Sequence, residues 1–106
     1  MVYTVPFAMP ITPRQRRELR ALGHHRNPIV AVGKEGLTEG VVSALDVALT
    51  THELVKVRIG QNCELDKHDA AAALAEQTGS EIAQVLGNTI LLYRRHPEKP
   101  KLLVDP

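Results

Sequence analysis

The residues with the clearest chemical potential are the four that follow an apolar run, Gly33-Lys34-Glu35-Gly36. A glycine-flanked turn that opens into a helix, with Thr38 as the expected N-cap, leaves backbone N–H groups unpaired at the positive end of the helix dipole. Such a helix N-terminus is a favourable place for a phosphate group. The missing Cβ atoms of Gly33 and Gly36 also let a sugar-phosphate backbone approach closely. The pattern therefore predicts a loop that contacts the backbone of a nucleic acid.

Charge is unevenly distributed along the chain, although the 106 residues carry a formal net charge of only +1. Residues 1–34 hold six Lys or Arg against one Glu, whereas residues 35–81 hold nine acidic residues against three basic ones. Segregated positive charge next to the glycine loop is typical of a protein that binds an anionic polymer. The alternative is a solvated, arginine-rich helix face. The arginines concerned are Arg14, Arg16, Arg17 and Arg20.

Composition excludes several classes of function. Tyr3, Phe7 and Tyr93 are the only Tyr or Phe residues, and Trp is absent, so the chain cannot build the stacking platform of single-strand binders. Cys63 is the only cysteine, which rules out an intramolecular disulfide and fits a reducing cytoplasm. No apolar run approaches the length of a membrane span, so we expect no membrane partner.

Periodicity predicts one small α/β domain over residues 10–96, with the element order α-β-α-β-α-β-β and flexible termini at 1–9 and 97–106. Thr12 is expected to cap the first helix, Gly23 to stop it, and Leu19 and Leu22 to face the core. Strands separated by helices favour parallel pairing, and a Gly-Asn hairpin adds an antiparallel pair, which gives a four-stranded mixed sheet. The helices are expected over 13–22, 38–50 and 67–78, and the strands over 29–32, 54–59, 81–86 and 89–94.

Alternation in the strand 54–59 places Val55, Val57 and Ile59 on one face and Lys56 and Arg58 on the other. If the second face is open, these two cations extend a phosphate-binding surface. If the first helix covers it, they are ordinary surface charges. Arg94 and Arg95, at the end of the last strand, are further candidates for this surface.

Four blocks of sequence, in order over about residues 10–95, resemble the stand-alone CRM domain (chloroplast RNA splicing and ribosome maturation) of YhbY-type bacterial proteins. The resemblance implies a fold similar to the C-terminal domain of translation initiation factor three. It also implies an RNA-binding protein that associates with the precursor of the large ribosomal subunit and assists its assembly. We expect this protein to be a monomer. The blocks are Thr12-Pro-Arg-Gln-Arg-Arg-Glu-Leu, Asn27-Pro-Ile-Val-Ala-Val-Gly-Lys-Glu-Gly-Leu-Thr-Glu-Gly-Val, His52-Glu-Leu-Val-Lys-Val-Arg-Ile and Gln84-Val-Leu-Gly-Asn-Thr-Ile-Leu-Leu-Tyr-Arg.

Residue by residue, the resemblance implies that Gly33, Lys34, Glu35 and Gly36 contact the RNA backbone, beside a basic first helix that carries the four arginines named above. Glu35 is a departure, because many relatives have a polar or basic residue there. A carboxylate repels phosphate unless it turns away or pairs with Lys34. The alternative function is a module that docks on a ribosomal protein through the basic sheet face and the first helix.

Enzymatic readings fit the residues less well. In a nucleotide-binding P-loop, Pro28 would stand where the first glycine is required and Glu35 where Ser or Thr is required. The potential zinc ligands are scattered, and the acidic residues near Asp66 are explained by helix capping. We therefore expect no catalytic residue, metal site or cofactor. After RNA binding and docking on a ribosomal protein, the third possible function is a phosphate-ester enzyme that uses the glycine loop to hold an anion. The scattered ligands are His24, His25, Cys63, His68 and His96.

Overall fold

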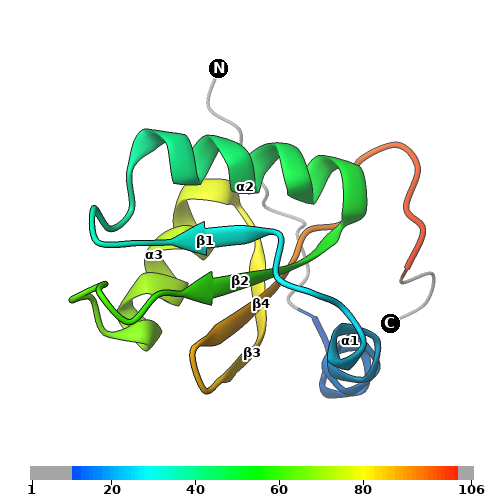
Figure 1. Ribbon diagram of the computed structural model, residues 1–106. Helices are drawn as coiled ribbons and strands as arrows, with labels where there is room; N and C mark the ends of the chain where they lie inside the picture. The colour runs from blue at the N-terminus through cyan, green and yellow to red at the C-terminus, as the bar shows by residue number, and fades with distance from the viewer. Residues whose placement is uncertain (1–10, 103–106) are drawn as a thin grey trace.

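The computed structural model describes residues 11–102, and its elements follow the predicted order α-β-α-β-α-β-β (Figure 1). The expected flexible segment 1–9 and the last four residues of the expected tail, 103–106, lie outside the described residues. Within 11–102, no helix is long and apolar enough to cross a membrane. The helices are α1 (Pro13–His24), α2 (Glu39–His52) and α3 (Lys67–Thr78), and the strands are β1 (Val30–Val32), β2 (Leu54–Ile59), β3 (Glu81–Leu86) and β4 (Thr89–Tyr93).

The four strands form one mixed sheet in the order β1-β2-β4-β3, as the predicted fold class requires. Strands β1 and β2 pair in parallel, with Val30 opposite Val57, whereas β4 is antiparallel to both β2 and β3. The predicted hairpin between β3 and β4 is confirmed, and Gly87 adopts a φ of +58° in its turn. Because β1 and β2 are parallel, their carboxyl ends meet at one edge of the sheet.

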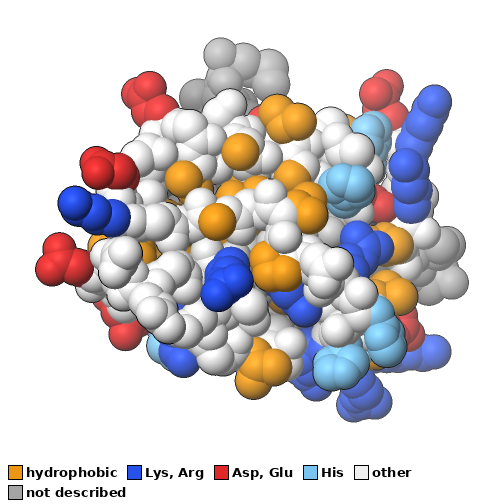
Figure 2. All heavy atoms as spheres, viewed as in Figure 1, with side chains coloured by type: hydrophobic (Ala, Val, Ile, Leu, Met, Phe, Trp, Pro, Cys, Tyr) orange, Lys and Arg blue, Asp and Glu red, His pale blue; other side chains and the backbone are white. Residues whose placement is uncertain are grey.

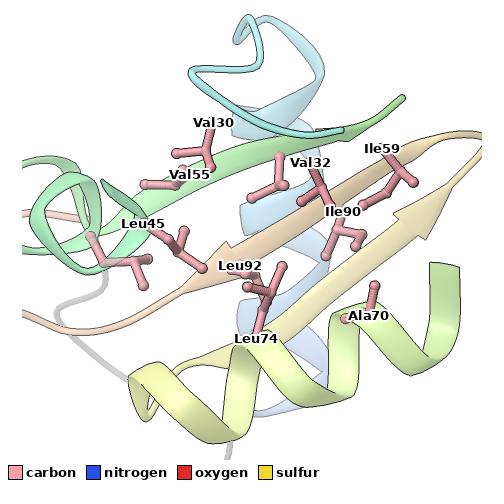
Figure 3. Close-up of a cluster of buried hydrophobic side chains, with 12 residues drawn as sticks. Val30, Val32, Leu45, Val55, Ile59, Ala70, Leu74, Ile90 and Leu92 are labelled. Carbon is pink, nitrogen blue, oxygen red and sulfur yellow. The ribbon is translucent and has the colours of Figure 1, made fainter. Parts of the chain in front are cut away.

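Helices α2 and α3 cover one face of the sheet and α1 packs on the other (Figure 1). The larger core lies beneath α2 and α3 and includes Val55 and Ile59 of β2, Leu45 of α2 and Leu74 of α3 (Figure 3). The predicted inward face of β2 is therefore confirmed. A smaller cluster lies beneath α1 and uses side chains from the opposite face of β2, β3 and β4. Its members are Ile11, Leu19, Leu54, Ala83, Leu91 and Tyr93.

Helix α1 begins as predicted but ends later and packs differently. Thr12 caps it and exchanges hydrogen bonds with Gln15. The prediction that Gly23 stops the helix is wrong, because α1 continues to His24 and Gly23 is buried against the sheet. Leu19 and Gly23 are four residues apart and share the inner face, so Leu22 lies beside that face and is 42% exposed. The prediction that Leu22 faces the core is therefore wrong as well.

Two predicted strand bounds also change by one residue. The strand expected over 29–32 begins at Val30, because Ile29 is 54% exposed and only its N–H reaches the sheet, at the carbonyl of Lys56. The last strand ends at Tyr93, since Arg94 turns its N–H to the carbonyl of Glu53. Both differences come from contacts between distant segments of the chain, which local periodicity does not encode.

Replacing Gly23 by alanine is expected to destabilise the protein by about 1–3 kcal/mol, because a Cβ at this position would lie 2.5 Å from Cδ2 of Leu91. At an exposed helix position the same change stabilises a protein by about 1 kcal/mol, so a loss of stability in Gly23→Ala indicates that α1 packs closely on the sheet. Gly40→Ala in α2 is the matched control, since its Cβ would make an ordinary 3.7 Å contact with Thr38 Oγ1. Chemical denaturation of both variants measures the difference, and a stabilised Gly23→Ala protein would contradict the close packing of α1.

Candidate nucleic-acid interface

The glycine loop forms a tight turn immediately after β1. The N–H of Gly36 donates to the carbonyl of Gly33 at 3.0 Å, and the N–H of Thr38 donates to the carbonyl of Gly36 at 3.1 Å. Gly36 adopts a φ of +76°, which strongly favours glycine. Gly33 has a different role, because a Cβ at this position would meet nothing within 4 Å. The turn therefore requires glycine at position 36, whereas position 33 simply leaves open space.

The two side chains at the tip of this turn, Lys34 and Glu35, are both exposed. No ion pair joins them within the described part of the chain. Glu35 is therefore not neutralised by Lys34, and the loop presents one cation and one anion to solvent. Glu39, in the first turn of α2, adds a second exposed carboxylate next to the loop.

Helix α2 starts directly after the loop, and Thr38 is its N-cap as predicted. The Thr38 hydroxyl accepts a hydrogen bond from the N–H of Val41 at 3.1 Å. Among residues 11–102, the N–H groups of Glu39 and Gly40 find no acceptor. These two amides face the solvent at the positive end of the helix dipole, so they are available to an anion that approaches the turn.

A second loop, between β2 and α3, lies beside the glycine loop at the carboxyl edge of the parallel strands (Figure 1). The N–H of Gly60 donates to the carbonyl of Val32 at 2.8 Å, and Leu65 approaches the Cβ position of Gly36 at 3.5 Å. Open α/β sheets bind ligands at the carboxyl ends of their strands. Sequence reasoning missed Gly60 as a support of the site; its only signal is a glycine directly after a predicted strand.

Lys56 and Arg58 lie on the face of the sheet that carries α1. Helix α1 covers the start of β2 at Leu54 and leaves the other end of the strand open, so Lys56 is half-buried and Arg58 is exposed. Arg58 is opposite Ala31 in the register, and that alanine is exposed too. The sequence left open whether this face of β2 is exposed or covered by the first helix. The structure shows that the face is exposed at Arg58, whereas Lys56 lies at the edge of the part that α1 covers.

The arginines of α1 lie at the opposite end of β2 from the glycine loop. From Leu54 beneath α1 to Ile59 beside the loop, β2 spans about 17 Å at its usual rise per residue. Arg14 and Arg17 are exposed, and Arg16 and Arg20 are half-buried. The four arginines and the loop therefore do not form one cluster, but Lys56 and Arg58 lie between them on β2.

Figure 2 displays this distribution, with Lys and Arg side chains gathered in the lower right region, where α1 lies. Acidic side chains are prominent at the left edge, where the glycine loop lies. The single ion pair within the α1 helix joins Arg14 and Glu18 at 3.6 Å, and both side chains are largely exposed. Exposed pairs of this kind contribute less than about 1 kcal/mol, so Arg14 can exchange its partner for a phosphate easily.

Arg94 is a structural residue, and its predicted place on the phosphate surface is wrong. Its guanidinium forms an ion pair with Asp46 at 2.6 Å and donates to the carbonyl of Thr78 at 2.8 Å and to the hydroxyl of Thr50. It therefore ties α2 and the end of α3 to β4. Arg26 is similar, because its guanidinium donates to the carbonyl of Leu54 and holds the end of α1 to the sheet.

Glu53 is a buried residue that sequence reasoning missed. It follows α2 with a φ of +64° and is only 1% exposed. Its carboxylate accepts hydrogen bonds from the backbone N–H groups of His96, Lys101 and Leu102, at 2.7, 2.7 and 3.2 Å. The segment 97–102, expected to be flexible, is thus held to the domain; we call residues 95–102 the C-terminal strap. No sequence signal distinguishes this glutamate from an ordinary residue at a helix end.

Tyr93 lies beside this carboxylate at the end of β4. Its side chain is buried beneath α1, and its hydroxyl has no hydrogen-bond partner within residues 11–102. Burial raises the pKa of Tyr93 to about 12; the charge of Glu53 acts in the same direction, and that of Arg95 opposes it. The phenol therefore stays neutral at physiological pH and contributes packing rather than charge.

Two further observations on residues 11–102 concern metal sites and cavities. Within residues 11–102, no three His, Cys, Asp or Glu side chains come close enough to hold a metal ion. A shallow hollow of about 350 Å³ lies between α2 and α3, on the face opposite α1, and two carboxylates line it. Its lining residues are Leu37, Glu39, Val42, Ser43, Asp46 and Gln77.

Comparison with known proteins identifies the family. Residues 11–94 match the CRS1 / YhbY (CRM) domain. The chain therefore belongs to the CRM domain family. This CRM domain is 41% identical over 92 residues to the Bacillus subtilis protein named "Probable RNA-binding protein YqeI", and the match covers 87% of this chain and 96% of that protein. The family resemblance inferred from the four sequence blocks is thus confirmed.

Two further relatives support the assignment. The CRM domain is 36% identical over 95 residues to the Pseudomonas aeruginosa protein named "Probable RNA-binding protein PA4753", with 90% of this chain and 91% of that protein covered. It also matches the solution structure of hypothetical protein SAV1595 from Staphylococcus aureus, with a TM-score of 0.77 and 38% identity over 90% of this chain and 99% of that one. The predicted fold class is therefore confirmed by a solved structure.

The two glycines of the loop are expected to respond differently to alanine. Gly36→Ala forces an L-residue to a φ of +76° and should lower the free energy of unfolding by about 1–2 kcal/mol. Gly33→Ala places its methyl group in open space and should change stability by less than about 0.5 kcal/mol. Thermal or chemical denaturation of both variants tests this difference. Equal losses for the two variants would contradict the separate roles assigned to them.

Proposed function

We propose that this CRM domain binds RNA through a composite surface made of the glycine loop, the open end of β2 and helix α1. One observation carries the proposal: Gly33 stands in open space on an exposed turn, directly before a helix N-terminus with unpaired amides. That combination admits a sugar-phosphate backbone and gives it donors. The Bacillus and Pseudomonas relatives are both named "Probable RNA-binding protein", which supports the same assignment.

Each part of the surface has a separate task in this proposal. The amides of Glu39 and Gly40 and the ammonium group of Lys34 bind one or two phosphates at the loop. Arg58 and Lys56 bind the next phosphates along β2, and the α1 arginines bind those beyond. Phosphate contacts position an RNA but do not read its sequence. With few aromatic residues for base stacking, the CRM domain recognises structured RNA by its shape.

The biological role proposed for this binding is assistance in assembling the large ribosomal subunit, in the cytoplasm. The RNA partner is then the rRNA precursor of that subunit. The CRM domain acts as a monomeric binding protein, contributes no catalytic group and needs no cofactor. Ribosomal proteins beside the bound rRNA are secondary partners of the same surface.

Fluorescence anisotropy against a structured fragment of large-subunit rRNA, over a salt series, tests the proposal. Each neutralised phosphate releases counterions, so the logarithm of the affinity should fall linearly with the logarithm of the salt concentration. A surface with several phosphate contacts should give a steep slope. Weak binding with a flat salt dependence would overturn RNA binding and favour docking on a ribosomal protein instead.

Lys34→Gln is expected to weaken RNA binding equally for all sequences and to reduce the magnitude of the salt slope by about one, because one phosphate contact is lost. Gln77→Glu is the matched control, since it lowers the net charge by the same amount on an exposed residue at the α2–α3 hollow. The control should retain the affinity of the unmodified protein. Identical losses in both variants would show that net charge, rather than the loop, governs binding.

Glu35→Gln is expected to strengthen RNA binding by up to about fivefold, because like charges about 4 Å apart in water repel by about 1 kcal/mol. Glu76→Gln removes an exposed carboxylate from α3 and serves as the control with the same change in net charge. Anisotropy titrations at low salt measure both effects. Weaker binding by Glu35→Gln would mean that this carboxylate accepts a hydrogen bond from the RNA.

A further inference from the structure

The C-terminal strap lies outside the part of the chain that matches the CRM domain, which ends at residue 94. It nevertheless has a defined position within the described residues. After Arg94 the strap passes over the buried Glu53, and its last residue, Leu102, packs against the cluster beneath α1. Figure 1 shows the strap at the same end of the molecule as α1. The strap is therefore a fixed addition to the side of the domain that carries the arginines.

The strap carries an excess of positive charge. Arg95, Lys99 and Lys101 are all exposed, and Glu98 is its one carboxylate. Figure 2 shows Lys and Arg side chains at the upper right as well as at the lower right of this view. No ion pair joins these three cations to an acidic residue within 11–102. Holding unpaired cations beside a basic helix is unfavourable alone and becomes favourable when a polyanion lies across both.

Glu53 explains how the strap is held in place. Helix ends with a positive φ favour glycine, yet this chain has a glutamate there, at a φ of +64°. The carboxylate compensates by accepting hydrogen bonds from three strap N–H groups, which a glycine cannot do. His96 adds a second constraint, because its Nδ1 accepts from the N–H groups of Glu98 and Lys99. The backbone around Lys99 and Lys101 is thus fixed at several points.

We propose that the C-terminal strap is a further RNA-binding element of this chain, with Glu53 as its positioning residue. Lys99 and Lys101 would bind phosphates beyond those held by the α1 arginines, so the RNA contact extends past residue 94, where the CRM domain match ends. The inference rests on the proposed function and deepens it. The ligand proposed for the strap is a strand of the same RNA, whose successive phosphates contact the lysines of the strap.

The double variant Lys99→Gln/Lys101→Gln tests the strap directly, because both side chains are exposed and their removal leaves the Glu53 hydrogen bonds intact. Its affinity for the structured large-subunit rRNA fragment should fall about tenfold at low salt, and the magnitude of the salt slope should fall by one to two. The matched control is Ala44→Glu/Gln77→Glu, which makes the same change in net charge on exposed positions of α2 and α3. The control should bind like the unmodified protein.

Glu53→Gly tests the positioning role separately. Glycine accepts the positive φ, so the helix end is retained, while the strap loses its acceptor. Amide hydrogen exchange at His96, Lys101 and Leu102 should become faster, and the RNA affinity should fall about as far as in the Lys99/Lys101 double variant. Faster exchange without loss of affinity would overturn the positioning role of Glu53.

The outcomes separate this inference from the proposed function. If Lys34→Gln weakens RNA binding and the Lys99/Lys101 double variant binds like the unmodified protein, the strap is not part of the interface and the proposed function stands. If the unmodified protein shows no salt-dependent binding of the RNA, the proposed function and the strap inference both fail. If the Lys99/Lys101 double variant loses more RNA affinity than the control variant, the result supports both the proposed function and the strap inference.

Discussion

Burial of β2 on both faces is the constraint on which the rest of the structure depends. This strand pairs with β1 on one side and β4 on the other, and its inward valines lie under α2 and α3. Its first residue, Leu54, is buried under α1 on the opposite face. Each such aliphatic side chain contributes about 1.5–3 kcal/mol when buried. Because α1 covers only one end of the strand, Arg58 at the other end stays exposed, and the same strand that organises the core also carries charge to the surface.

The close approach of α1 to the sheet follows from this arrangement. Gly23 stands where a Cβ would overlap Leu91, so the helix rests directly on β4 and α1 cannot shift along the sheet without losing that contact. The arginines of α1 are thereby placed on the outer sides of a helix of fixed position. The acidic residues of the middle of the chain fall mainly on α2, α3 and the loops. Segregation of charge along the sequence thus becomes segregation between surfaces.

Features governed by neighbouring residues could be predicted from the sequence. The caps at Thr12, Thr38 and Asp66 are as expected, because a capping side chain bonds to amides two or three residues away. Gly23, Arg94 and Glu53 could not be assigned correctly, since their partners lie on segments far away in the chain: Leu91, Asp46 and the C-terminal strap. In the candidate site, the loop could be recognised from its glycines. How much of the sheet face α1 leaves open depends on packing alone, so it could not be predicted from the sequence.

The charge around the glycine loop determines how such a surface can work. Lys34 is followed by Glu35 and Glu39, and all three side chains are exposed, so the loop and the start of α2 have no net positive charge of their own. A single phosphate held there gains little beyond the hydrogen bonds of the exposed amides. In the proposed surface, affinity for a polyanion is therefore distributed along β2, α1 and the C-terminal strap, and the loop contributes mainly through its shape. In a distributed surface each contact contributes a small share, and the salt dependence of the whole, rather than the effect of any one residue, is its defining property.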